Sequence, residues 1–125
     1  EMGYRLARRG KAPEYPEDAV QGRAYDPKVD HPLLVPTTAS SGPDWTFEDF
    51  IRAVAQARGG KAAVLTFHGV PDLDHAWVHT EPALFERCMA HLHAEEYRVV
   101  AMRDLAPYIH PSAEAADPYA CIVGA

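Results

Sequence analysis

Apolar positions recur every three or four residues over residues 46–58, which predicts an amphipathic helix. Thr46 can cap its first turn, and Asp49, three residues later, echoes a capping box. Gly59 ends the pattern. The apolar face consists of Phe47, Phe50, Ile51 and Val54.

A different pattern follows Gly59 and Gly60. Residues 61–68, Lys-Ala-Ala-Val-Leu-Thr-Phe-His, form an apolar run that is too short for a stable helix, so we predict a buried strand. The run ends in a polar residue, His68. Ligands of α/β proteins bind outside the carboxyl ends of the strands, which makes His68 the first candidate for a functional residue.

The last part of the pattern begins with a second helix. This helix is predicted to start after Thr80, with Pro82 in its first turn. Its apolar face consists of Leu84, Phe85, Cys88, Met89 and Leu92. A further strand over residues 98–102 and a short helical turn capped by Asp104 complete the series.

The order helix, strand, helix, strand, helix predicts an α/β fold with a few parallel strands and covering helices. Residues 3–10 could add a short strand, because apolar side chains alternate there with other residues. Residues 11–43 are rich in proline and show no clear period, so we expect a long loop, either ordered or disordered. We assign residues 1–112 to one domain and residues 113–125 to a tail.

Composition excludes several classes of function. The chain has 125 residues, enough for one domain, and a net charge of −6 with its histidines neutral. Basic residues are scattered apart from Arg8 and Arg9, so nucleic acid is not an expected partner. No apolar run approaches the roughly 20 residues of a membrane span, and no leader is visible. Cys88 and Cys121 are too few for a disulfide framework or a zinc ribbon, and we interpret Cys88 as a core residue.

Titratable and aromatic residues gather directly after the predicted strand. They are His68, Asp72, Asp74, His75, Trp77 and His79. The unperturbed pKa of histidine is about 6.5, so His68 can act as a general acid or base near neutral pH; a buried structural histidine is the alternative. Trp77 could stack on a sugar ring or cover the core as a lid, and we favour the lid. The candidate substrate contacts are Asp72, His75, Trp77 and His79.

A metal site in this loop is a second interpretation. His75 and His79 have the spacing that places two imidazoles on one face of a helix. The predicted helix begins only after them, so we expect irregular backbone, on which this spacing has no fixed meaning. We therefore favour solvated side chains over a metal bound by these histidines, His68 and a loop aspartate, and we assign no metal ligand.

Three segments carry a family resemblance. They are Ala62-Val-Leu-Thr-Phe-His-Gly-Val-Pro-Asp72, the helix over residues 82–92, and Glu96-Tyr-Arg-Val-Val-Ala-Met-Arg-Asp-Leu105. Together they resemble the C-terminal half of the polysaccharide deacetylase family, the NodB-homology domain of carbohydrate esterases. Two positions depart from the family pattern. Leu65 lies three residues before His68 instead of two, and Glu96 replaces the usual helix-ending glycine, which predicts a loosened helix end.

The resemblance implies the C-terminal part of a distorted (β/α) barrel that removes N- or O-acetyl groups from sugars with a divalent, zinc-like metal. It also implies that His68 is the general acid that protonates the leaving amine or hydroxyl. In the family the metal ligands come from two upstream motifs, Thr-Phe-Asp-Asp-Gly and His-x-x-x-His. Neither motif occurs in this chain before the strand that ends at His68.

We therefore expect a deacetylase, a hydrolase of non-peptide carbon-nitrogen bonds, in the full-length protein, and a fragment that is inactive alone. Its expected partners are an acetylated carbohydrate and the missing N-terminal part of its own domain. The alternative is a non-catalytic carbohydrate-binding or lid module derived from the same fold. A small metal protein that uses the loop histidines is a third possibility.

Overall fold

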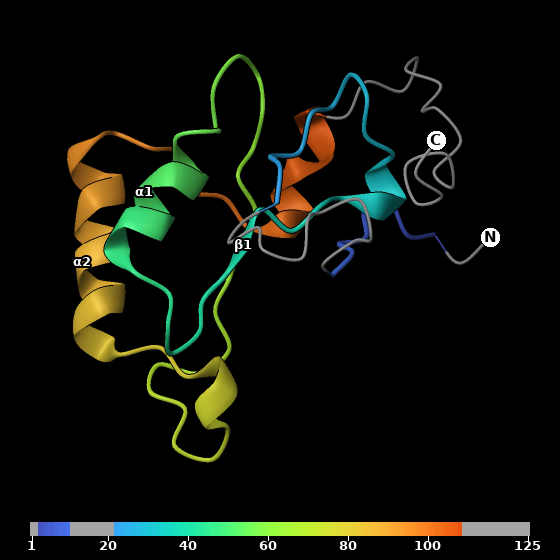
Figure 1. The fold of residues 1–125 in the computed structure, drawn as a ribbon. Coiled ribbons are helices and arrows are strands. Elements are labelled where there is room, and N and C mark those ends of the chain that lie inside the picture. The colour runs from blue at the N-terminus through green and yellow to red at the C-terminus, as the bar shows by residue number, and fades with distance from the viewer. Residues whose placement is uncertain (1–2, 11–21, 109–125) are drawn as a thin grey trace.

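The computed structural model describes residues 3–10 and 22–108 (Figure 1). The tail that we assigned to residues 113–125 lies outside these ranges. The elements are η1 (Pro32–Leu34), β1 (Ala39–Ser40), α1 (Phe47–Val54), β2 (Leu65–Thr66), η2 (Ala76–Val78), α2 (Pro82–Ala94) and η3 (Met102–Tyr108), where η marks a 3-10 helix. In the described part of the chain, no helix has the length and apolar content needed to cross a membrane.

The sheet of the described residues is a parallel pair of short strands. β1 and β2 pair in parallel, with Ala39 opposite Leu65, and α1 forms the connection between them. The described residues are thus mixed α/β with a two-stranded parallel sheet, and the sequence analysis did not predict one of these two strands. β1 lies in the segment that we expected to be a loop.

Two strand predictions need correction. The strand predicted over residues 61–68 is regular only at Leu65–Thr66, although an antiparallel bridge between Tyr25 and Ala62 extends the pairing. Residues 98–102 form no strand: residues 97–101 have no regular structure, and Met102 begins η3. A run with strand propensity still needs a neighbouring strand for its backbone hydrogen bonds, and here it has none among the described residues.

α1 begins where the sequence predicts. The Asp49 N–H donates to Thr46 Oγ1 at 3.1 Å, and the Thr46 N–H donates to Asp49 Oδ2 at 2.8 Å, which completes the capping box. Asp49 also pairs with Arg52 one turn later. These bonds satisfy backbone donors that a helix start otherwise leaves unpaired.

The main core lies where α1 and α2 pack side by side, beside the strand pair (Figure 1). Phe50 is fully buried at its centre, with its ring centroid 5.9 Å from each of those of Trp45, Phe47 and His91. Edge-on and stacked rings at this separation add to the apolar area that they bury. Cys88 is fully buried in the same cluster, as predicted.

The end of α2 is closed, not loosened as predicted. Glu96 itself takes the left-handed conformation that a glycine would adopt, with φ 56°. The Tyr97 N–H then donates to the Leu92 carbonyl at 2.9 Å, and the Glu96 N–H donates to the His93 carbonyl at 3.2 Å. The helix-end hydrogen bonds are formed, and the cost is a backbone strain at a non-glycine residue.

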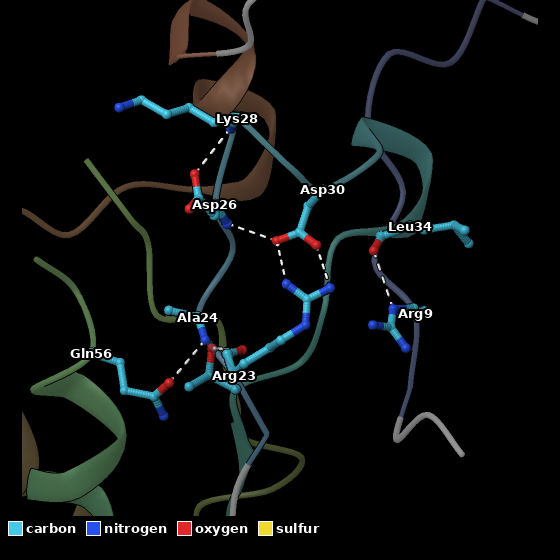
Figure 2. A network of polar contacts seen from close by, with 9 residues as sticks. Arg9, Arg23, Ala24, Asp26, Lys28, Asp30, Leu34 and Gln56 are labelled. Atoms are coloured by element: carbon cyan, nitrogen blue, oxygen red, sulfur yellow. Dashed lines mark hydrogen bonds and ion pairs between the residues drawn. The ribbon is translucent and has the colours of Figure 1, made fainter. Parts of the chain in front are cut away.

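The described part of the predicted loop, residues 22–43, is ordered. Asp30 is buried, pairs with Arg23 (Oδ2 to NH1, 2.7 Å), and accepts the Asp26 N–H at 2.7 Å (Figure 2). Gln56 accepts the Ala24 N–H at 3.0 Å and so ties this segment to the end of α1 (Figure 2). Polar contacts therefore hold this segment in place, and the apolar pattern that predicts regular elements is absent from it.

Residues 3–10 do not form the strand that their alternation suggested. They contribute an isolated parallel bridge between Arg8 and Val35. The Val35 N–H donates to the Ala7 carbonyl at 2.9 Å, and Arg8 NH1 donates to Thr37 Oγ1 at 2.7 Å. This segment is thus held against the residues that lead into β1.

Candidate functional site

The candidate site lies beyond the carboxyl ends of β1 and β2, where residues 68–80 form a loop that contains η2 (Figure 1). His68 is two residues past β2, and its side chain is exposed. It makes no hydrogen bond with any described residue. His68 is thus exposed just beyond β2, and its role as a functional residue stays a prediction.

The backbone beside His68 is held by Thr80. The Thr80 N–H donates to the Gly69 carbonyl at 3.1 Å, and a parallel bridge joins Gly69 to His79. The buried Thr80 hydroxyl donates to Ser41 Oγ at 2.7 Å. The two ends of the loop are thus fixed to each other and to the residue that follows β1.

Asp72 accepts two hydrogen bonds from His75. The His75 N–H donates to Asp72 Oδ1 at 2.9 Å, and His75 Nδ1 lies 3.0 Å from the same oxygen. Burial acts to raise the pKa of Asp72, but the hydrogen bonds from His75 and its charge outweigh this effect, so the pKa is lowered. Asp72 is therefore a carboxylate that orients His75 through Nδ1–H, while 57% of the His75 side chain stays exposed.

His79 is fixed by two different partners. Its Nδ1 accepts the Asp72 N–H at 3.0 Å, and its Nε2 lies 2.8 Å from Glu81 Oε1. Because Nδ1 accepts a backbone N–H, this network assigns the ring proton to Nε2, from where it is donated to Glu81. Sequence analysis missed Glu81, since nothing in its position just before the helix signals a partner for His79.

Trp77 is not a lid over the core, contrary to our expectation. Its side chain is 71% exposed, and its ring lies edge-on to His75 with the centroids 5.3 Å apart. η2 turns the loop so that the indole faces solvent beside an imidazole. The other interpretation of Trp77, a stacking surface, is compatible with this exposure.

The loop brings some candidates together and leaves others apart. Asp72, His75 and His79 form one hydrogen-bonded chain, whereas His68 has no hydrogen bond to them. His75 and His79 flank η2 and lie outside it, His75 without regular structure and His79 in an isolated bridge, so they share no helix face, as predicted. No group of three or more His, Cys, Asp or Glu side chains within residues 3–10 and 22–108 could hold a metal ion. Within these residues, the loop histidines and aspartates do not gather into such a group.

Comparison with known proteins adds no relative. No protein-family model matches the chain, and no curated protein or solved structure matches it significantly. Its function is therefore inferred from the sequence and the site alone.

Proposed function

We propose that the chain is the C-terminal portion of a polysaccharide deacetylase-like barrel domain, which hydrolyses N- or O-acetyl groups on carbohydrate. Three sequence segments support this proposal by their resemblance to the family. The site supports it through His68, an exposed imidazole at the carboxyl end of a parallel strand. That is the place from which α/β folds present catalytic groups.

In this proposal His68 is the general acid. When the tetrahedral intermediate of acetyl transfer collapses, the imidazolium donates its proton to the departing nitrogen or oxygen of the sugar. An exposed ring on an anchored backbone suits this role, because the ring can reach a substrate while Thr80 holds the adjacent Gly69 carbonyl. The contribution of such an acid is typically 10² to 10⁴ fold in rate.

The loop supplies groups that suit a sugar ligand. Trp77 offers an exposed ring face, and the Asp72 carboxylate and His75 Nε2 can meet hydroxyl groups. His79 is committed to Glu81 and the Asp72 N–H, so it shapes the loop from within. We therefore assign the substrate contacts to Asp72, His75 and Trp77, and an orienting role to His79.

The divalent metal that the resemblance implies finds no donor set in the described residues. We derive no step through it. The groups that would bind it must come from another part of the domain, and the isolated chain should therefore be inactive toward a chitooligosaccharide or acetylxylan. Deacetylation of either substrate by this chain alone, above a denatured control, would contradict the proposal.

The test of His68 uses the longer protein that contains this chain. His68→Ala should lower turnover about 10² to 10⁴ fold, because the leaving group loses its proton donor. His93→Ala is the matched control, since His93 is exposed on α2 away from the loop. Equal turnover for the two variants would show that His68 has no catalytic role.

A second candidate function is a non-catalytic carbohydrate-binding or lid module derived from the same fold. The exposure of Trp77 favours it, because a stacking indole binds sugar without any chemistry. Titration of the chain with an acetylated oligosaccharide, followed by fluorescence, separates the two. Binding that Trp77→Ala abolishes, in a longer protein without deacetylase activity, would establish the binding module.

A further inference from the structure

Glu81 occupies the N-cap position of α2 but does not cap that helix. Ser, Thr, Asp and Asn are the usual residues at this position, where their side chains bond a free backbone N–H of the first turn. The Glu81 side chain makes no such bond, and its Oε1 lies 2.8 Å from His79 Nε2. Glu81 is therefore bonded to the loop and not to the helix that it precedes.

The bond to Glu81 decides which nitrogen of His79 carries the proton. A neutral imidazole has one N–H donor and one acceptor nitrogen, and a carboxylate can only accept. Glu81 thus keeps the proton on Nε2 and leaves Nδ1 as the acceptor of the Asp72 N–H, at 3.0 Å. Without Glu81 the proton is free to move to Nδ1, and the Asp72 N–H then loses its acceptor.

The position of Asp72 in turn determines those of His75 and Trp77. Asp72 Oδ1 accepts the His75 N–H at 2.9 Å, and His75 Nδ1 lies 3.0 Å from the same oxygen. The His75 ring lies edge-on to the Trp77 ring, with the centroids 5.3 Å apart. A continuous series of contacts thus joins Glu81 to the residues that we assign to substrate contact.

The bond between His79 and the Asp72 N–H also requires a neutral imidazole. An imidazolium donates from both nitrogens, so its Nδ1–H would face the Asp72 N–H and the bond would be lost. A protonated His75, in contrast, still donates to Asp72. The titratable groups around His79 are Glu81 at the start of α2, Asp72 and His75 in the loop, and His68, which precedes the bridge between Gly69 and His79.

We infer that Glu81 is a positioning residue, which acts through His79 to hold the sugar-contact loop in place. This inference rests on the proposed function for the identity of the ligand, an acetylated carbohydrate. The loop should be formed in neutral solution and released in acid, when His79 takes up a second ring proton. Histidine side chains in general become protonated below about pH 6.5.

Nitrogen-15 NMR of the chain tests the position of the proton directly. At pH 8 the ring proton of His79 is expected on Nε2, with the Asp72 amide resonance at a hydrogen-bonded position. Acidification to pH 5 should move this resonance toward its position in an unstructured peptide. Glu81→Ala should show a mixture of the two neutral ring forms, and the released Asp72 amide already at pH 8.

The conservative variant Glu81→Gln separates the hydrogen bond from the charge. The Gln amide oxygen can still accept Nε2–H, so the Asp72 amide should stay bonded at pH 8. The variant lacks the carboxylate charge that favours an imidazolium, so the loop should be released at a lower pH than in the native chain. Glu86→Ala and Glu86→Gln are the matched controls and should behave like the native chain, because Glu86 is exposed on α2 without a described hydrogen-bond partner.

Three NMR results would overturn the inference. They are a ring proton on Nδ1 of His79 in the native chain, an Asp72 amide that Glu81→Ala leaves unchanged, and release of the loop at the same pH in Glu81→Gln and the native chain.

Affinity for an acetylated chitooligosaccharide, followed by tryptophan fluorescence, gives a second readout. At pH 8, Glu81→Ala should weaken binding about fivefold, the loss expected for one hydrogen bond that holds the loop, and Glu86→Ala should not. Equal affinities for the two variants would overturn the positioning role. If the native chain binds no acetylated sugar while the NMR results are as expected, the proposed function loses its ligand and the positioning of the loop by Glu81 stands.

Discussion

Gly69→Ala should destabilise the protein because Asp72 occupies the space that a side chain at position 69 needs. An added Cβ would lie 2.5 Å from Asp72 Cβ and 2.9 Å from Asp72 Oδ2. Asp72 would have to move by roughly 1 Å to reach ordinary contact. That movement pulls Oδ1 away from the two bonds that it accepts from His75.

The magnitude follows from these two effects. Forcing an extra methyl group into a packed position costs about 1–3 kcal/mol, and each lost hydrogen bond costs about 1 kcal/mol. Water can replace part of the second loss, because the loop is partly exposed. We expect a decrease of about 1–3 kcal/mol in the free energy of unfolding, which lowers the melting temperature by roughly 4–12 °C.

Urea unfolding followed by circular dichroism measures this change, with Gly10→Ala as the control. A Cβ at Gly10 would meet no atom within 4 Å. NMR titration of the Asp72 carboxyl gives a local readout: its pKa should rise toward the ordinary value in Gly69→Ala, since the His75 hydrogen bonds that lower it are weakened.

A double-mutant cycle isolates the contact. In an Asp72→Gly background the colliding Cβ is absent, so Gly69→Ala should cost no more than Gly10→Ala. If Gly69→Ala matches Gly10→Ala in the native background and leaves the pKa of Asp72 unchanged, the reasoning from this contact is refuted.

Other predictions concern the core and the end of α2. Phe50→Ala should cost about 3–5 kcal/mol in urea unfolding, because it empties the centre of the aromatic cluster; a cost below 1 kcal/mol would contradict that placement. Burial raises the pKa of Cys88 to about 11, so the unfolded thiol ionises first and stability should fall as pH rises from about 9 to about 11. Cys88→Ala should flatten this part of the pH profile, and an unchanged slope would exclude the thiol. Glu96→Gly should relieve about 0.5–1 kcal/mol of backbone strain and so raise the melting temperature, whereas Glu96→Ala should not raise it.

The helices were predictable because their signals are local. The capping box of Thr46 and Asp49 depends only on residues within one helical turn, and the apolar face around Phe50 on residues within two. The same holds for the buried position of Cys88 on α2. Each of these features needs only neighbours that are close in sequence.

The strands were harder because their signals depend on distant partners. β1 is only two residues long and follows two threonines, so it has no apolar run. Thr38, just before it, is nevertheless fully buried, since its hydroxyl donates to the Arg23 carbonyl at 3.1 Å and accepts the Val64 N–H at 2.8 Å. A hydrophobic pattern cannot detect a buried residue whose hydroxyl is satisfied in this way. Residues 98–102 show the opposite error, since strong strand propensity forms no strand where no partner is present among the described residues.

The candidate site was predictable in position and not in its bonding. His68 follows from the end of an apolar run. The pairing of Asp72 with His75, and of His79 with Glu81, depends on how the loop backbone turns through η2. Residue types and spacing do not contain that information.

The hydrogen bond between Thr80 and Ser41 has a consequence for how this site can change during evolution. It joins residues 39 positions apart at the base of the loop, inside the protein and away from solvent. Residues 70–78 can therefore lengthen, shorten or exchange their side chains while both stems keep their anchor. The side chains that this loop presents can therefore vary as a unit, without new mutations in the strands or helices that support it.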